Sequence, residues 1–169
     1  MKIQLSKVEN IPNIMEIIDD AKAYLASQNI DQWQNGYPNA EQIENDIEKG
    51  ESYVVITDEN QIIATAMFTT NKESTYKVID GTWFVNEDEN YGVIHRMAIK
   101  KEYRKFGLAT FLFDEFHLQL FEKNIKSLKI DTHEDNKGMQ SLIKKLGYQY
   151  CGIIYTSYGD KRLAFEKVF

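Results

Sequence analysis

The feature that most constrains the fold is a strand, a glycine turn and a helix that follow one another directly. Val93–Ile99 (VIHRMAI) reads as a strand, and an apolar helical pattern runs over Gly107–Lys123. Between them, Tyr103–Thr110 reads YRKFGLAT. The first amides of a helix have no internal acceptor, and the helix dipole adds about half a positive charge there. We therefore expect an anion-binding turn, or alternatively an ordinary helix start with incidental basic residues.

The composition of this turn suits a phosphate group. Gly107 allows a ligand to approach the backbone without a β-carbon in the way, and Ala109 is small for the same reason. Arg104 and Lys105 would neutralise a diphosphate, and Thr110 could offer a hydroxyl. The turn lacks the GK[ST] ending of a Walker loop and the GxGxxG of a dinucleotide fingerprint, so neither of those classes is indicated.

The remaining sequence predicts alternating strands and helices in one domain over residues 1–169. Helices are expected after Asn10, after Asn39, over Gly107–Lys123 and over Asn136–Leu146. The other strands are expected at Lys2–Ser6, Ser52–Thr57, Gln61–Thr70, Ser127–Thr132, Tyr148–Tyr155 and Lys161–Lys167. The order β-α-α-β-β-β-α-β-α-β-β indicates a mixed α/β sheet.

The bulk composition excludes several classes of protein. The net charge is -6, which argues against a nucleic-acid partner. No apolar run approaches the about 18 residues of a membrane span, and no signal-peptide pattern is present, so we expect no membrane association. Cys151 is the only cysteine, so no intrachain disulfide can form and the cytoplasm is the expected compartment. Cys151 alternates with apolar residues and is expected in the core.

The stretch RKFGLA, Arg104–Ala109, resembles the pattern Arg/Gln-x-x-Gly-x-Gly/Ala of the acyl-CoA pyrophosphate loop in the GNAT superfamily of N-acetyltransferases. Downstream, DNKGMQSLIKKLGY is similar to that family's N-x-x-A…GF/GY element, with Asn136 and Gly147–Tyr148 in place. The resemblance covers about residues 93 to 148. It implies a GNAT-like acyl-CoA N-acyltransferase fold, with a central mixed, mostly antiparallel sheet flanked by helices, and acetyl-CoA as the cofactor.

The resemblance also implies where the cofactor binds. In the family, the strand before the loop splays from the next strand, and the pantetheine arm enters the gap. A strand edge can recognise this amide chain as it would another strand. The implied contacts are the backbone of Met97, Ala98 and Ile99 and the side chain of Asn136 for pantetheine, and the amides of Arg104, Lys105, Phe106, Gly107, Leu108, Ala109 and Thr110 for the pyrophosphate. No metal is implied.

Acetyl transfer to an amine needs a base, because a free alkylamine has a pKa near 10.4 and about one molecule in a thousand is neutral at pH 7.4. His95 is the candidate, since an imidazole suits proton relay and strand alternation puts His95 on the face of Met97. The alternative is a histidine packed on the sheet. His133 is a second candidate, whose alternative role is to orient the helix start at Asn136. His117 is expected at the surface or in packing.

One position departs from the family pattern. Many members carry a tyrosine seven residues after the asparagine, where it protonates the CoA sulfur, but Ile143 stands there in this chain. Water, Tyr155 or Tyr158 would then supply the proton, or the thiolate would leave unassisted. Tyr148 is expected to pack.

The acceptor side is expected at the loop Gln28–Ala40, where Trp33 and Tyr37 could form an aromatic wall for a cation, joined by Trp83. The alternative is that Trp33 fastens this loop to the core. The sequence thus predicts an acetyl-CoA-dependent N-acetyltransferase acting on a primary amine of a small molecule. A non-catalytic acyl-CoA sensor and a protein lysine or N-terminal acetyltransferase remain as alternatives, and a homodimer is left open.

Overall fold

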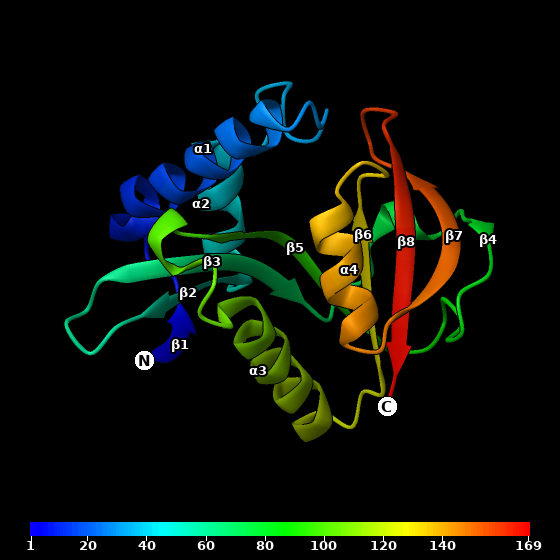
Figure 1. Cartoon of the computed structure of the whole chain (residues 1–169). Helices are drawn as coiled ribbons and strands as arrows, with labels where there is room; N and C mark the ends of the chain where they lie inside the picture. Colours follow the sequence, from blue (N-terminus) through cyan, green and yellow to red (C-terminus); the bar gives the residue numbers. More distant parts are fainter. The chain divides into compact units, whose positions relative to one another are not determined.

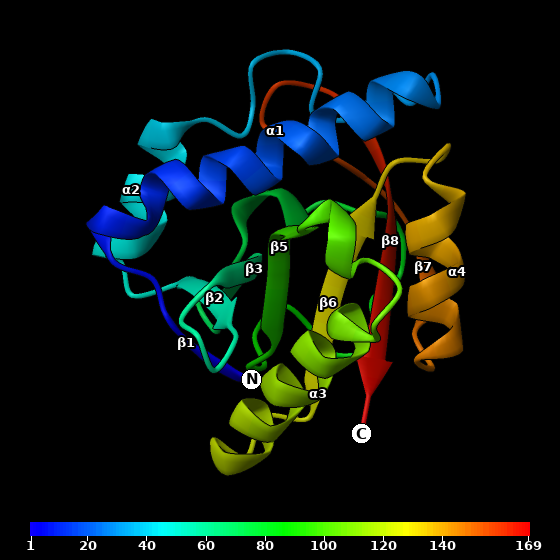
Figure 2. The same ribbon diagram turned by 60° about the vertical axis from the view of Figure 1, so that its left-hand side comes forward.

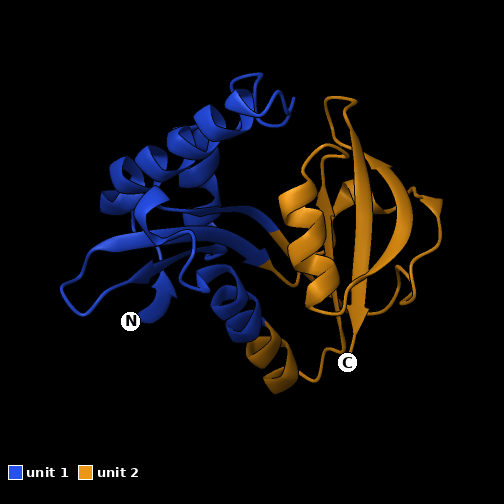
Figure 3. Cartoon of the chain, in the orientation of Figure 1, with its two compact units in different colours: residues 1–68, 95–116 blue, residues 69–94, 117–169 orange.

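The computed structural model describes residues 1–169, which form two compact units. Unit 1 comprises Met1–Phe68 and His95–Phe116, and unit 2 comprises Thr69–Ile94 and His117–Phe169 (Figure 3). The strand β5 (Gly92–Ile99) and the helix α3 (Leu108–Glu122) each contribute to both units. None of the helices combines the length and apolar character that a membrane-spanning helix requires.

In unit 1, helices cover both faces of a small sheet. Its strands follow the order β1 (Lys2–Leu5), β2 (Ser52–Ile56), β3 (Ile62–Thr69) and the end of β5 (Figure 1), and β1–β2 and β2–β3 are antiparallel. The helices α1 (Ile11–Ser27) and α2 (Ala40–Glu48) bury isoleucines against Val54 of β2. The neighbouring Tyr53 points to the opposite face, where its ring centroid lies 5.3 Å from that of Phe116 in α3. In the ribbon, α1 and α3 lie on opposite sides of these strands (Figure 2).

Unit 2 is built around three longer strands. These are β6 (Ser127–Thr132), β8 (Lys161–Val168) and β7 (Gln149–Tyr155), in that order, followed by the short β4 (Asp80–Gly81). The start of β5 pairs with β6 in parallel through two residue pairs, Gly92↔Leu128 and Val93↔Lys129, and the other pairings in this unit are antiparallel. The helix α4 (Lys137–Lys145) lies beside these strands (Figure 1).

The predicted mixed α/β sheet and its element order are confirmed, with boundaries within about two residues. The sequence missed β4, because a strand of two residues carries no periodicity. Glycines make this pairing feasible: a Cβ at Gly81 would lie 2.1 Å from the carbonyl oxygen of Cys151. Three short 3-10 helices were also missed, at Val8–Asn10, Ser74–Tyr76 and Lys101–Tyr103.

Candidate functional site

In unit 1, the end of β5 presents a backbone edge that no other strand of the unit covers. The amide of Lys100 donates to the carbonyl of Ile63 in β3 at 2.9 Å. Because the peptide group is trans, the carbonyl of Ile99 points the other way, toward the open edge. There it accepts a hydrogen bond from Nε of Arg104 at 3.2 Å. The side chain of Arg104 therefore lies at the open edge of β5.

Arg104 carries a buried donor that the protein does not satisfy. Its Nη2 is buried and has no hydrogen-bond partner, while its guanidinium carbon lies 4.9 Å from the ring centroid of Tyr24 in α1. An unpaired buried donor costs about 1–3 kcal/mol, which an oxygen of a bound ligand would recover. Both Arg104 and Lys105 were predicted to neutralise a diphosphate; Lys105 is exposed, whereas the side chain of Arg104 turns back onto β5.

The turn after the 3-10 helix Lys101–Tyr103 leaves several amides without acceptors. Only two of its amides bond locally, that of Arg104 to the carbonyl of Lys101 at 3.5 Å and that of Phe106 to the carbonyl of Tyr103 at 3.3 Å. The amide of Phe111, bonded to the carbonyl of Gly107 at 3.0 Å, is the first in α3 with an acceptor four residues back. The amides left without a backbone acceptor are those of Lys105, Gly107, Leu108, Ala109 and Thr110.

Gly107 is required by the conformation of this turn. Its φ is +74°, in the left-handed region that glycine enters without steric cost. A Cβ built at Gly107 would have no atom within 4 Å, so the space beside the turn is open. Free amides, open space and the exposed Lys105 lie together at this turn, and its binding of an anion stays a prediction.

The strand leading to this turn has a kink that the sequence did not reveal. Arg96 has a φ of +50°, an unfavourable conformation for a residue with a side chain. The kink interrupts the alternation from which we placed His95 and Met97 on one face, so that argument does not hold across Arg96. Both of these side chains are half-buried, whereas Ala98 lies in the core against α1 and α2. A role for His95 as the base stays a prediction.

The side chain of Arg96 is tied into unit 1 by a buried ion pair. Nε and Nη2 lie 2.6 Å and 2.8 Å from the two carboxylate oxygens of Asp46 in α2, and Nη1 donates to the hydroxyl of Tyr37 at 2.5 Å. The side chains of Arg96 and Asp46 are only 9% and 3% exposed. Burial acts to lower the pKa of Arg96, but the Tyr37 oxygen and the Asp46 carboxylate outweigh it and raise that pKa. Arg96 is therefore a fixed cation.

The three aromatic residues predicted for the acceptor side have different surroundings. Trp33 packs against the α1–α2 core, in agreement with the alternative that it fastens its loop. Tyr37 is half-buried and bonded to Arg96. Trp83 belongs to the core of unit 2, being 8% exposed, and its indole nitrogen donates to the carbonyl of Tyr76 at 2.9 Å. We therefore leave Trp83 out of the acceptor side that the sequence predicted.

In unit 2, Asn136 begins α4. Its Oδ1 accepts from the amide of Met139 at 3.1 Å. Nδ1 of His133 accepts from the amide of Asp135 at 3.1 Å, so His133 supports this helix start, as the alternative role predicted. Ile143 is fully buried in α4 and has no proton to give.

Other residues of unit 2 have structural roles. Nε2 of His117 lies 2.8 Å from the hydroxyl of Tyr148, which is 3% exposed, and both serve in packing, as predicted. The expected core position of Cys151 is confirmed, and burial raises the pKa of its thiol to about 12. Tyr155 and Tyr158 are exposed, although partial burial raises the pKa of Tyr158.

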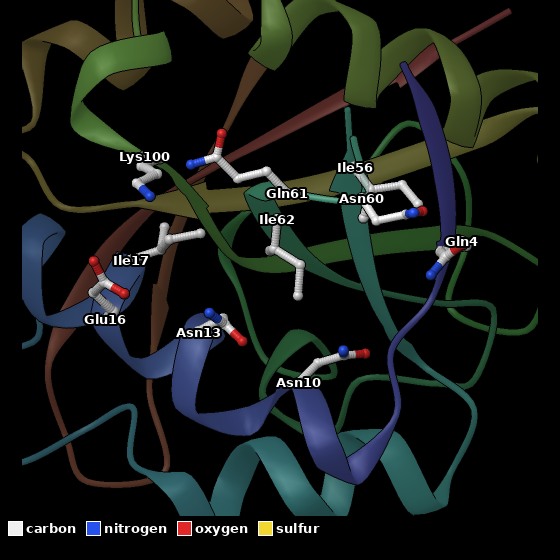
Figure 4. Close-up of a pocket in the computed structure, with 10 residues that line it drawn as sticks. All are labelled: Gln4, Asn10, Asn13, Glu16, Ile17, Ile56, Asn60, Gln61, Ile62 and Lys100. Carbon is white, nitrogen blue, oxygen red and sulfur yellow. The ribbon is translucent and has the colours of Figure 1, made fainter. Parts of the chain in front are cut away.

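A separate cavity of about 320 Å³ lies in unit 1 between β1, the start of α1 and the β2–β3 hairpin (Figure 4). Its lining combines isoleucines with polar side chains, namely Lys100, Glu16 and several side-chain amides. None of the residues from Arg104 to Thr110 lines it, so it is distinct from the turn predicted to bind an anion.

Comparison with known proteins identifies the family. The model of the acetyltransferase (GNAT) family matches residues 15–148. A GNAT-family acetyltransferase structure from Streptococcus agalactiae is 35% identical, with a TM-score of 0.83 over 99% of this chain and 95% of that one. The chain belongs to the GNAT acetyltransferase family, whose members are acyltransferases that typically use acetyl-CoA.

Two further structures share the fold at lower identity. A GNAT-family acetyltransferase from Listeria monocytogenes is 15% identical, with a TM-score of 0.78 over 99% of this chain and 94% of that one. A ribosomal-protein-alanine N-acetyltransferase from Brucella melitensis is 15% identical, with a TM-score of 0.68 over the full length of both chains. No curated protein sequence matches this chain.

The buried ion pair predicts a large effect of Asp46→Asn on stability. The substitution keeps the shape of the side chain but leaves the Arg96 cation buried without its counter-charge, which should lower the free energy of unfolding by about 3 kcal/mol. Urea denaturation followed by circular dichroism measures this. Asp20→Asn, at an exposed position of α1, is the matched control and should change stability by less than about 0.5 kcal/mol. Equal effects of the two substitutions would contradict the assignment.

Proposed function

We propose that this protein is an acetyl-CoA-dependent N-acetyltransferase that acts on a primary amine of a small molecule. The observation that carries the proposal is the set of unsatisfied donors at the junction of β5 and α3: the buried Nη2 of Arg104 and the free amides that follow Gly107. Donors of this kind suit an anionic ligand that runs from a strand edge to a helix start. The exposed Lys105 adds a positive charge beside them.

The residues of this junction fit the parts of acetyl-CoA. The free amides at the start of α3 would hold the diphosphate, together with Lys105. The open edge of β5 at Met97–Ile99 would pair with the amides of the pantetheine arm. The carbonyl of Ile99 already accepts from Arg104, but its second lone pair remains for a ligand amide. The family resemblance also assigns Asn136 of unit 2 to pantetheine, and this assignment stays a prediction.

Bound acetyl-CoA supplies an activated acetyl thioester. The protein must then bring a neutral amine to it, and producing that form from an alkylammonium at pH 7.4 costs about 4 kcal/mol. We propose His95 as the group that takes this proton, directly or through water. Ile143 offers nothing to the departing sulfur, but a thiol with a pKa of about 8.5 can leave as the thiolate without an acid.

The direct test combines calorimetry with a thiol-release assay. Acetyl-CoA should bind with a dissociation constant below the millimolar range. Thiol should be released with at least one member of a panel of tyramine, spermidine, lysine methyl ester and an alanyl hexapeptide. Cys151 should give little background, because its buried thiol has a pKa of about 12 and stays protonated.

The outcomes of this test separate the candidate functions. No binding at millimolar acetyl-CoA would refute the proposal. Tight binding without turnover of any amine would favour a CoA-binding module that does not catalyse transfer. The specific reason for this alternative is Ile143, which is buried and stands at the position of the usual proton-donating tyrosine. Turnover of the hexapeptide alone would point to a protein acceptor.

Gly107→Glu tests the diphosphate position. A carboxylate at this turn would repel the ligand, so the dissociation constant for acetyl-CoA should rise about a hundredfold relative to Gly107→Gln. Glutamine is the matched control, because both side chains have the same bulk and strain the backbone equally at a φ of +74°. Equal affinities of the two variants would remove the diphosphate from this turn.

His95→Ala tests the proposed base. Turnover should fall about a hundredfold and the acidic limb of the pH–rate profile should flatten, while KM for acetyl-CoA stays within about twofold. Steady-state kinetics across pH 6 to 9 measures this, with His133→Ala as the control. A pH–rate profile that keeps its shape in His95→Ala would exclude His95 from proton transfer.

A further inference from the structure

We propose that Arg96 is a positioning residue for His95: its buried attachment to Asp46 and Tyr37 holds the left-handed kink of β5 and thereby sets the direction of the His95 side chain. This inference rests on the proposed function for its catalytic meaning, since His95 matters as a base only in acetyl transfer. Its structural content can be measured without turnover.

The kink needs an external constraint. A φ of +50° at an arginine is sterically unfavourable, and such residues keep this conformation only where the surroundings enforce it. Without such a constraint, the backbone of Arg96 would adopt the extended conformation of a regular strand. We assign this constraint to the contacts that the Arg96 side chain makes with Asp46 and Tyr37.

Those contacts fix Arg96 from two directions. Asp46 takes two parallel hydrogen bonds, at 2.6 Å and 2.8 Å, a geometry that defines the plane of the guanidinium group. Asp46 is itself held by Nε2 of Gln42 at 3.0 Å, within α2. On the other side, Nη1 donates to the hydroxyl of Tyr37 at 2.5 Å, which ties in the loop between α1 and α2. A lysine could not reproduce this three-point attachment.

The kink decides how its neighbours are presented. His95 precedes Arg96 and Met97 follows it, so the rotation at Arg96 sets the directions of these two side chains relative to each other. Residues 97–99 form the open edge proposed for pantetheine. Releasing Arg96 should therefore reorient His95 relative to this edge and leave the turn Arg104–Thr110, which has its own contacts, unchanged.

The experiment uses the histidine ring signals in the NMR spectrum of the ligand-free protein at fixed pH. The chain has three histidines, and His117 and His133 lie in unit 2, where they serve as internal references. In Arg96→Lys and in Tyr37→Phe, the His95 signal should move while the His117 and His133 signals stay in place. Tyr37→Phe keeps the ring and the ion pair, so it should fold even where Arg96→Lys does not. Tyr150→Phe, at an exposed tyrosine, is the matched control.

Kinetics then separates positioning from general stabilisation. For an amine from the panel, kcat should fall about tenfold in Tyr37→Phe, while the calorimetric dissociation constant for acetyl-CoA stays within about twofold. His95 signals that stay in place in both variants would overturn the inference. A dissociation constant for acetyl-CoA that rises in Tyr37→Phe by as much as kcat falls would also overturn it. If the wild-type protein binds acetyl-CoA but turns over no amine, the proposed function fails, and the NMR result alone decides whether Arg96 orients His95.

Discussion

The structure of the candidate site depends on amides that the start of α3 cannot bond internally. A helix leaves its first amides unpaired, and here the preceding turn uses only those of Arg104 and Phe106. Leu108, Leu112 and Phe116 are buried, which fixes the direction of α3 beneath its sheet. The glycine at the turn then lets the chain enter the helix without covering these amides. The start of α3 therefore both packs in the core of unit 1 and leaves amides unpaired that could bind a ligand.

The strand β5, before this turn, contributes an open backbone edge and two arginines to the candidate site. Its end is the edge of the unit 1 sheet, and Arg104 bonds the outermost carbonyl while keeping one buried donor unused. Arg96, earlier in the strand, is instead fully engaged, with Asp46 and Tyr37 as partners. One arginine thus stabilises the strand conformation, and the other leaves a donor for a ligand. The chain belongs to the GNAT acetyltransferase family, whose members typically use acetyl-CoA, and the oxygen atoms of that molecule would suit this donor.

Local sequence rules predicted the parts of the fold that depend on local physics. Asn39 caps α2 by accepting from the amide of Gln42 at 2.9 Å, and Asn136 caps α4 in the same manner. The glycine turn was predicted because a strand, a glycine and an apolar helical pattern follow one another directly, whereas the left-handed conformation of Gly107 was not predicted. The residue pattern predicted the mixed sheet and the order of its elements, and the family resemblance added the GNAT-like fold; the structure and the comparisons confirm both.

The features of the site that the sequence did not predict depend on tertiary contacts. The kink at Arg96 depends on Asp46, fifty residues earlier in the chain, and no local pattern distinguishes it from a regular strand. Arg104 turns inward because Tyr24 and the Ile99 carbonyl are there to receive it. Trp83 looked available for a ligand, but its indole nitrogen found the carbonyl of Tyr76. These contacts form only on folding, and those of Arg96 with Asp46 and of Arg104 with Tyr24 join residues far apart in the sequence.

The most direct measurement of the central claim is an NMR titration of the 15N-labelled protein with coenzyme A. The account predicts that the amide signals of Gly107, Leu108 and Ala109 shift strongly as the ligand is added, together with the Nη2 protons of Arg104. Saturable binding that leaves these signals in place and perturbs amides elsewhere would contradict it.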